Sequence, residues 1–157
     1  MKKVTVSKLI EKYIGKVFED LEQKYPGLYP DLYTGNIEKQ TLQNDYFRQV
    51  LFTTKNLQLV VMCLQPGEEI GDEVHQNVDQ FFRIEEGEAK FIFNEKSEYI
   101  GRDGDAVIVP QGTFHNVINI GKNQLRLYTL YSPPNHPKGT IHKTKSEAEQ
   151  AEKTNTV

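Results

Sequence analysis

The stretch GDAVIVPQGTFHNVIN, residues 104–119, decides the fold of this chain. Its first half, DAVIV, is predicted to be a buried strand, and Pro110 and Gly112 then predict a sharp turn. His115 opens the next predicted strand with its ring facing inward. Asn119 comes four residues later and points to the same side, because side chains alternate along a strand. Two short strands joined by a tight turn are therefore expected here.

Five more segments have the composition and length typical of short strands. They are rich in Val, Ile, Phe and Tyr, and Gly, Pro, Asn or Asp separate them. The segments are YFRQVLFTT, LQLVVMCLQ, QFFRIEEG, AKFIFN and LRLYTLYSP. Short strands with turn signals about every ten residues are typical of a β-sandwich or barrel. The sequence therefore predicts an all-β fold.

Helices are predicted only outside the strands. In residues 8–24 five apolar residues recur at helical spacing and form one stripe: Ile10, Ile14, Val17, Phe18 and Leu21. The tail, TKSEAEQAEKTNTV, has Thr144 and Glu147 at capping-box spacing. Because the tail lacks an apolar stripe, it is expected to be a short solvent-exposed helix.

The length of 157 residues is within the usual range for one domain. A single domain over residues 1–157 is expected. It comprises an N-terminal helix and connection (1–44), a barrel (45–132), and a Pro-rich exit and tail (133–157).

Charge and composition limit the kinds of binding partner and the cellular compartment that are expected. The formal net charge of −3 argues against a nucleic-acid surface, which normally has a basic excess. No apolar run approaches the roughly 20 residues that span a bilayer, and the N-terminus lacks the apolar core of a secretory signal. The single cysteine, Cys63, excludes an internal disulfide. We therefore expect a cytoplasmic protein with no nucleic-acid or membrane partner.

The deciding stretch resembles the second signature of the cupin superfamily, G-x5-P-x-G-x2-H-x3-N. It matches at every fixed position: Gly104, Pro110, Gly112, His115 and Asn119. The resemblance runs from about Leu51 to Tyr131 and looks closest to small single-domain bacterial cupins, some labelled mannose-6-phosphate isomerase-like. It implies a double-stranded β-helix, a jelly-roll barrel of two antiparallel sheets, with a metal-centred pocket and commonly a homodimer.

The first cupin signature, G-x5-H-x-H-x3–4-E-x6-G, is matched in spacing between Gly67 and Gly87. Glu73 stands at the first ligand position, His75 at the second, and Gln80 at the carboxylate position. Two ligand identities thus differ from the signature. With His115, the resemblance implies a site for a divalent cation.

Strand parity supports this ligand set. Glu73 and His75 are two apart on an extended segment and so face one side, and Gln80 shares a face with Phe82 and Ile84. Asp79 is the alternative third ligand, because the signature permits three intervening residues. Gln80 is preferred because Asp79 has the opposite parity and misses the spacing to Gly87.

One carboxylate, two imidazoles and one amide oxygen suit Fe, Mn, Ni or Zn in the divalent state. The alternative is a barrel without metal, in which His75 is an ordinary strand-end histidine and Glu73 a solvated loop residue.

Four more charged or titratable side chains are candidates for substrate contact. His136 and His142 lie in the exit segment and are expected to be surface histidines rather than residues at the barrel mouth. Arg48 and Arg126 would hold an anionic substrate group if they pointed inward. An outer-face position is the preferred interpretation for both.

The expected function is that of a metal-dependent enzyme acting on a small oxygen-rich substrate, such as a sugar, sugar phosphate or keto acid. Isomerase-like chemistry is favoured over that of a dioxygenase. Glu73 would be a metal ligand or, if it swings free, a general base. The alternative from another class is a non-catalytic small-ligand-binding or sensory module.

Overall fold

The computed structural model describes residues 10, 13, 14, 16, 17 and 32–154. The chain divides into two compact units, Met1–Thr34 and Gly35–Val157. The predicted helix at 8–24 lies largely outside the described residues, although the five described ones within it are helical. None of the helices in the described part of the chain is long and apolar enough to cross a membrane.

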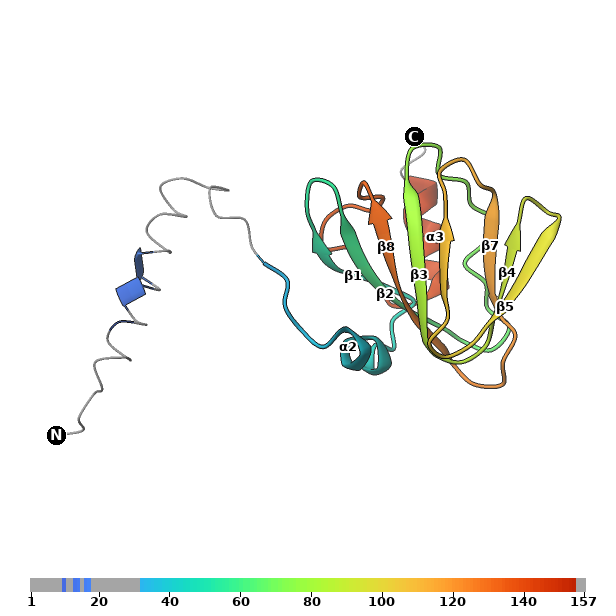
Figure 1. The fold of residues 1–157 in the computed structure, drawn as a ribbon, viewed down its shortest axis with the longest axis horizontal. Helices are drawn as coiled ribbons and strands as arrows, with labels where there is room; N and C mark the ends of the chain where they lie inside the picture. Colours follow the sequence, from blue (N-terminus) through green and yellow to red (C-terminus); the bar gives the residue numbers. More distant parts are fainter. Residues whose placement is uncertain (1–9, 11–12, 15, 18–31, 155–157) are drawn as a thin grey trace. The chain divides into compact units, whose positions relative to one another are not determined.

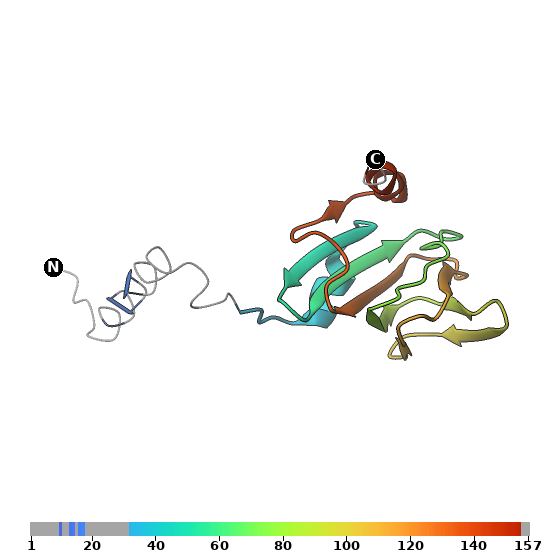
Figure 2. The same ribbon diagram turned by 90° about the horizontal axis from the view of Figure 1, so that it is seen from above.

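Among the described residues of the second unit, nine strands form two antiparallel sheets, whose arrangement can be followed in Figures 1 and 2. In chain order the strands are β1 (Arg48–Thr53), β2 (Gln58–Leu64), β3 (Asp79–Glu86), β4 (Ala89–Phe93), β5 (Ser97–Gly101), β6 (Ala106–Val109), β7 (His115–Asn119), β8 (Leu125–Ser132) and β9 (Ile141–His142). The larger sheet has the order β6-β3-β8-β2-β1-β9 and the smaller one β5-β4-β7. The predicted all-β jelly-roll is confirmed.

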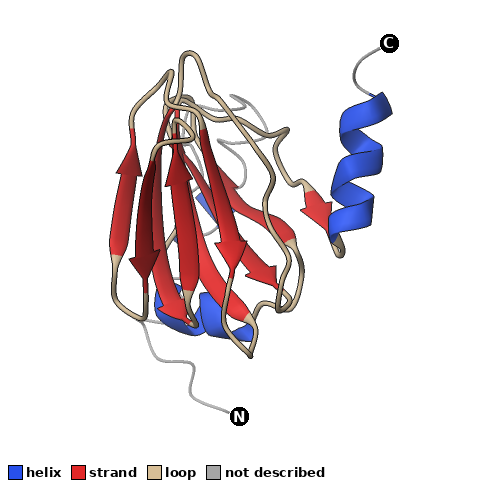
Figure 3. Ribbon diagram, turned by 90° about the vertical axis from the view of Figure 1, so that its right-hand side faces the viewer, coloured by secondary structure: helices blue, strands red, loops and turns tan. Residues whose placement is uncertain are grey.

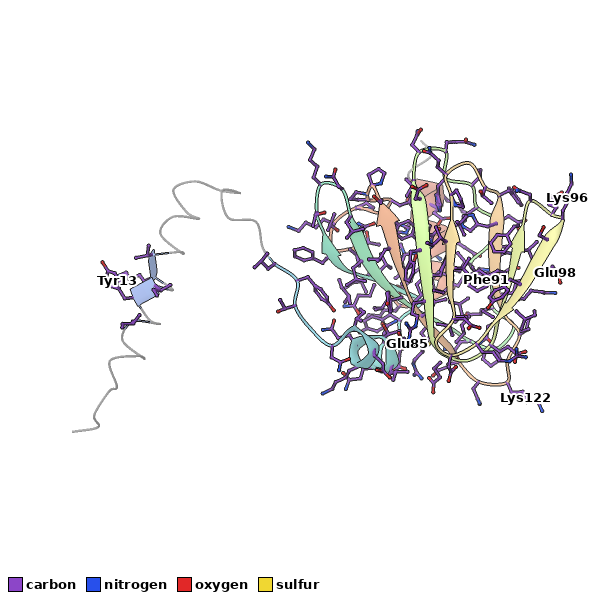
Figure 4. The ribbon with its side chains drawn as sticks, viewed as in Figure 1. Tyr13, Glu85, Phe91, Lys96, Glu98 and Lys122 are labelled. Carbon is purple, nitrogen blue, oxygen red and sulfur yellow. The ribbon has the colours of Figure 1, made fainter. Side chains whose placement is uncertain are left out.

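The core lies between the inner faces of the two sheets. In β3 the buried side chains are Gln80, Phe82 and Ile84, which alternate with partly exposed neighbours. Phe82 packs edge-to-face against Phe91 of β4, with ring centroids 5.4 Å apart. Figure 4 shows Phe91 within the barrel and Lys122 at its outside. Burying side chains of this size stabilises the fold by about 2 kcal/mol each.

Strand β6 is not buried as predicted. Ile108 at its centre is 70 % exposed, because β6 is an edge strand of the larger sheet and turns one side chain in two toward solvent. Strand β5 is absent from the sequence expectations. Its residues, SEYIG, are mostly exposed and lack a clear apolar alternation.

A short helix, α2 (Ile37–Gln43), lies within residues 1–44, where the sequence predicted only the N-terminal helix and a connection. Asn36 caps it, since its side chain accepts a hydrogen bond from the Lys39 amide at 2.9 Å. The helix packs beside β2, β3 and β8.

The predicted tail helix is α3 (Lys145–Thr154), drawn in blue beside the barrel in Figure 3. Thr144 Oγ1 accepts from the Glu147 amide at 3.2 Å, as the capping box predicts. Most residues of this helix are solvent-exposed as expected, with the exception of Ala148, which is only 3 % exposed and joins the core. Strand β9 leads into α3 and pairs with β1, which brings the exit segment back onto the barrel.

Candidate metal centre

Backbone hydrogen bonds bring the two signature segments together. The Glu73 and His115 main chains exchange two hydrogen bonds, of 2.9 Å and 2.8 Å, and this pairing sets the two residues side by side. The Gly112 amide donates to the His75 carbonyl at 2.8 Å. Gly112 has a φ of 78°, a conformation that glycine adopts without strain, so the turn after Pro110 serves to hold His75.

The side chains of Glu73, His75 and His115 meet inside the barrel, and their potential ligand atoms all lie within 4.8 Å of one another. Glu73 Oε2 is 3.4 Å from His75 Nε2 and 3.8 Å from His115 Nε2. Gln80 Oε1 lies 3.1 Å from His115 Nε2. The predicted residues are thus neighbours, and three of them could hold a metal ion.

His115 presents a lone pair to this cluster. Its Nδ1 lies 2.9 Å from the Thr113 carbonyl, which only accepts, so Nδ1 carries the proton and Nε2 of the neutral ring is an acceptor. Gln80 Nε2 donates to Thr129 Oγ1 at 3.0 Å, which turns Oε1 toward His115. Two acceptors therefore face each other, an arrangement that calls for a proton or a cation between them.

Two more buried polar atoms of the cluster lack hydrogen-bond partners. Glu73 Oε2 and His75 Nε2 are buried and have no hydrogen-bond partner among the described residues. Buried polar atoms without partners are rare because they cost free energy. A divalent cation would satisfy both, and a carboxylate, two imidazoles and an amide form a donor set that such an ion accepts.

The electrostatics keep Glu73 ionised. Burial acts to raise the pKa of Glu73, but the His75 ring, Arg48 and His115 together outweigh it, and the pKa is lowered below its usual value. A carboxylate is the form that binds a cation.

Asp79, the alternative ligand, lies outside the cluster. Its side chain is exposed, and Oδ1 accepts a hydrogen bond from the Gln111 amide at 2.9 Å. Parity along β3 therefore separates the two candidates as expected, with Gln80 facing inward.

The two arginines face opposite sides of the larger sheet. Arg126 lies on the outer face, where it pairs with Asp45 at 2.6 Å and Glu86 at 2.7 Å, as expected. The outer-face expectation is wrong for Arg48, which is only 2 % exposed. It shares the buried face of β1 with Val50, and His142 of the neighbouring strand β9 and Glu152 of α3 lie close to its guanidinium.

The expectation of surface histidines is also wrong for the exit segment. His136 and His142 are both half-buried. His136 Nε2 lies 3.3 Å from Tyr131 Oη, and the two rings meet edge-on. His142 Nδ1 lies 3.4 Å from Arg48 Nη1.

Tyr131 borders the site, and Gln58, opposite it on β2, holds the exit segment; neither emerged from the sequence. Tyr131 is buried at the end of β8 opposite Gln80, edge-on to the His75 ring at 5.9 Å, and burial raises the pKa of its hydroxyl. Gln58 accepts hydrogen bonds from the Asn135 and His136 amides and donates to the His136 carbonyl. Tyr131 is an even number of residues from the buried Leu125 and Leu127, so the alternation along β8 could have predicted that its side chain faces inward.

A pH effect on stability follows from His136. Burial, followed by Arg48, lowers its pKa from 6.5 to about 3. Because the unfolded chain takes up this proton near pH 6.5 and the folded chain does not, stability is lost as the pH falls below 6.5. Between pH 7 and pH 5 this loss is about 2 kcal/mol. We expect His136→Asn to remove that part of the acid sensitivity in urea unfolding. An equal loss in both proteins would contradict the assignment.

Comparison with known proteins agrees with this fold. A family profile described as "Cupin domain" matches residues 60–131. The Bacillus subtilis protein YrkC is 43 % identical over 140 residues, which are 86 % of this chain and 75 % of YrkC. The mimivirus protein L612 is 40 % identical over 113 residues, 70 % of this chain and 71 % of L612. A crystal structure of BH2720 from Bacillus halodurans covers 80 % of this chain and 97 % of its own, with 41 % identity and a TM-score of 0.75. The chain belongs to the cupin family.

Proposed function

We propose that this cupin is a metal-dependent enzyme acting on a small oxygen-rich substrate, with Glu73, His75, Gln80 and His115 as the metal ligands. The observation that carries the proposal is the convergence of four potential ligand atoms inside the barrel, two of which are buried without hydrogen-bond partners. Glu73 Oε2 and His75 Nε2 lack hydrogen-bond partners among the described residues, and Gln80 Oε1 lies 3.1 Å from His115 Nε2.

A divalent cation bound there would act as a Lewis acid toward a carbonyl or hydroxyl oxygen of the substrate. The chain supplies the remainder of the site. Tyr131 and His136 place a hydroxyl and an imidazole beside the ligands, in contact with each other and, through Tyr131, with His75. Polar groups in that position suit the orientation of a substrate with several oxygens.

Glu73 has two roles open to it, and its pKa favours one of them. A general base works best when its pKa lies near the working pH. The pKa of Glu73 is lowered instead, although burial acts in the opposite direction. We therefore propose Glu73 as a ligand first, with a role as base tested separately by Glu73→Gln, which keeps an oxygen donor but cannot accept the proton.

Isomerisation is the reaction class that we favour. It needs a Lewis acid and proton transfer but no external oxidant, and sugars, sugar phosphates and keto acids all offer a carbonyl with a neighbouring acidic C–H. A dioxygenase would additionally need a redox-active metal.

The test combines metal analysis with turnover. The full chain is purified, stripped with chelator and reloaded separately with Fe, Mn, Ni or Zn, and each form is assayed on aldose and ketose phosphates and on keto acids. We expect turnover with at least one metal, abolished by chelator and restored by adding that metal back. Metal retention without turnover in every form would favour a non-catalytic binding module. Absence of metal at every loading would refute the proposed centre.

A further inference from the structure

A buried arginine lies in the same barrel as the proposed metal centre, and the side chains around it do not neutralise its charge or satisfy all of its hydrogen-bond donors. Arg48 is 2 % exposed at the start of β1, on the face shared with Val50. Its Nε is buried without a hydrogen-bond partner among the described residues. A buried guanidinium normally has its donors satisfied, because an unpaired buried charge is costly.

The groups around Arg48 do not supply the missing acceptor. Nη1 lies 3.4 Å from His142 Nδ1, and burial followed by Arg48 lowers the pKa of that histidine, which favours its neutral form. The ion pair with Glu152 is long, at 3.8 Å, and the Glu152 side chain is 67 % exposed. The Phe47 ring lies 5.4 Å from the guanidinium carbon and offers only its face.

Arg48 points into the barrel rather than away from it. It stands opposite Met62 of β2 in the strand register, and Met62 is fully buried in the core between the two sheets. Directly opposed residues of an antiparallel pair turn their side chains to the same face, so the guanidinium lies in the barrel interior. The proposed ligand Gln80 faces that same interior beside Phe82 and Ile84.

We propose that Arg48 is the specificity residue of this site, and that the substrate carries a carboxylate or phosphate group which Arg48 binds through its free donor. The inference rests on the proposed function and narrows it from any small oxygen-rich compound to an anionic one. An arginine fork matches the oxygens of either group with two parallel hydrogen bonds, which a lysine cannot do.

The probes are acetate and inorganic phosphate, with acetamide as the neutral comparator of acetate. Binding to the full chain is measured by calorimetric titration, and metal content is determined on the same sample. We expect at least one of the two anions to bind and acetamide not to bind. Arg48→Gln should weaken binding of that anion at least tenfold with unchanged metal content, and Arg48→Lys should weaken it less. The better of the two anions identifies the class of group.

Arg126→Gln is the matched control, because it removes an arginine from the opposite face of the same sheet. Its anion affinity should equal that of the wild type. Unchanged anion binding in Arg48→Gln, or failure of both anions to bind the wild type, overturns the proposal and leaves the metal centre untouched. Anion binding that depends on Arg48 in a protein that never retains metal supports the anion site and refutes the metal centre.

Discussion

Replacing His115 with alanine is expected to lower the metal content of the purified protein to below about one tenth of the wild-type value. Loss of one ligand from a four-donor site typically weakens metal binding by more than the 10- to 100-fold seen for outer-shell changes. His115 is also the residue that links the other donors, since its Nε2 lies near both Glu73 and Gln80. Metal content by plasma mass spectrometry, and affinity by competition with a chelator, are the measurements.

A second variant and a control make this result specific. His115→Gln fills more of the buried space than alanine does and should retain the fold while still losing most of the metal. Asp79→Asn changes the neighbouring carboxylate that the signature spacing also permits, and its metal content should be that of the wild type. Wild-type stoichiometry in both His115 variants would remove this residue from the ligand set. Loss of metal in Asp79→Asn alone would transfer the third ligand position to Asp79.

The elements that the sequence predicted well are those encoded by local pattern. The inner and outer faces of β3 follow from the alternation of Gln80, Phe82 and Ile84 with their neighbours, and that alternation separates Gln80 from Asp79. The turn at Gly112 follows from the residue type that its positive φ requires. Each of these depends only on residues within a few positions, so periodicity and turn chemistry suffice.

The parts that the sequence did not predict depend on contacts between distant segments. Arg48 has no local feature that distinguishes it from Arg126. Arg48 is buried because β9 pairs with β1 and α3 follows β9. His142 of β9, which contacts Arg48, is 94 residues further along the chain. His136 is half-buried because Gln58 binds the backbone of the exit segment. Contacts between such distant segments leave no periodic pattern in the sequence, because the residue types that make them also occur at many exposed positions.

The position of β6 at the edge of its sheet is another feature that the sequence did not predict. The segment AVIV, residues 106–109, is apolar throughout, which is typical of a strand buried on both faces. The structure places it at the margin of the larger sheet, with Ile108 exposed. Strand order is a property of the whole topology, so composition alone does not distinguish an edge strand from a central one.

Asn119→Ala is expected to destabilise the fold by about 3 kcal/mol without changing metal content. The side chain is buried at the end of β7 and holds three chain segments. Its Nδ2 donates to the carbonyls of Leu64 and Asn123, both at 2.9 Å, and its Oδ1 accepts from the Gly121 amide at 2.9 Å. Alanine leaves these backbone groups without partners, and each costs roughly 1 kcal/mol or more when buried. The free energy of unfolding in urea measures the loss.

This expectation assigns the last fixed position of the second signature to the scaffold. Asn119 shares a strand and an inward direction with His115, yet its side-chain hydrogen bonds all go to backbone atoms. Asn56→Ala, at an exposed asparagine in the turn between β1 and β2, should change stability by less than about 0.5 kcal/mol. If Asn119→Ala unfolds at the wild-type urea concentration, the three hydrogen bonds do not hold the end of β7. If it instead loses metal while keeping its stability, Asn119 belongs with the ligands, and the division between scaffold and site drawn along β7 is wrong.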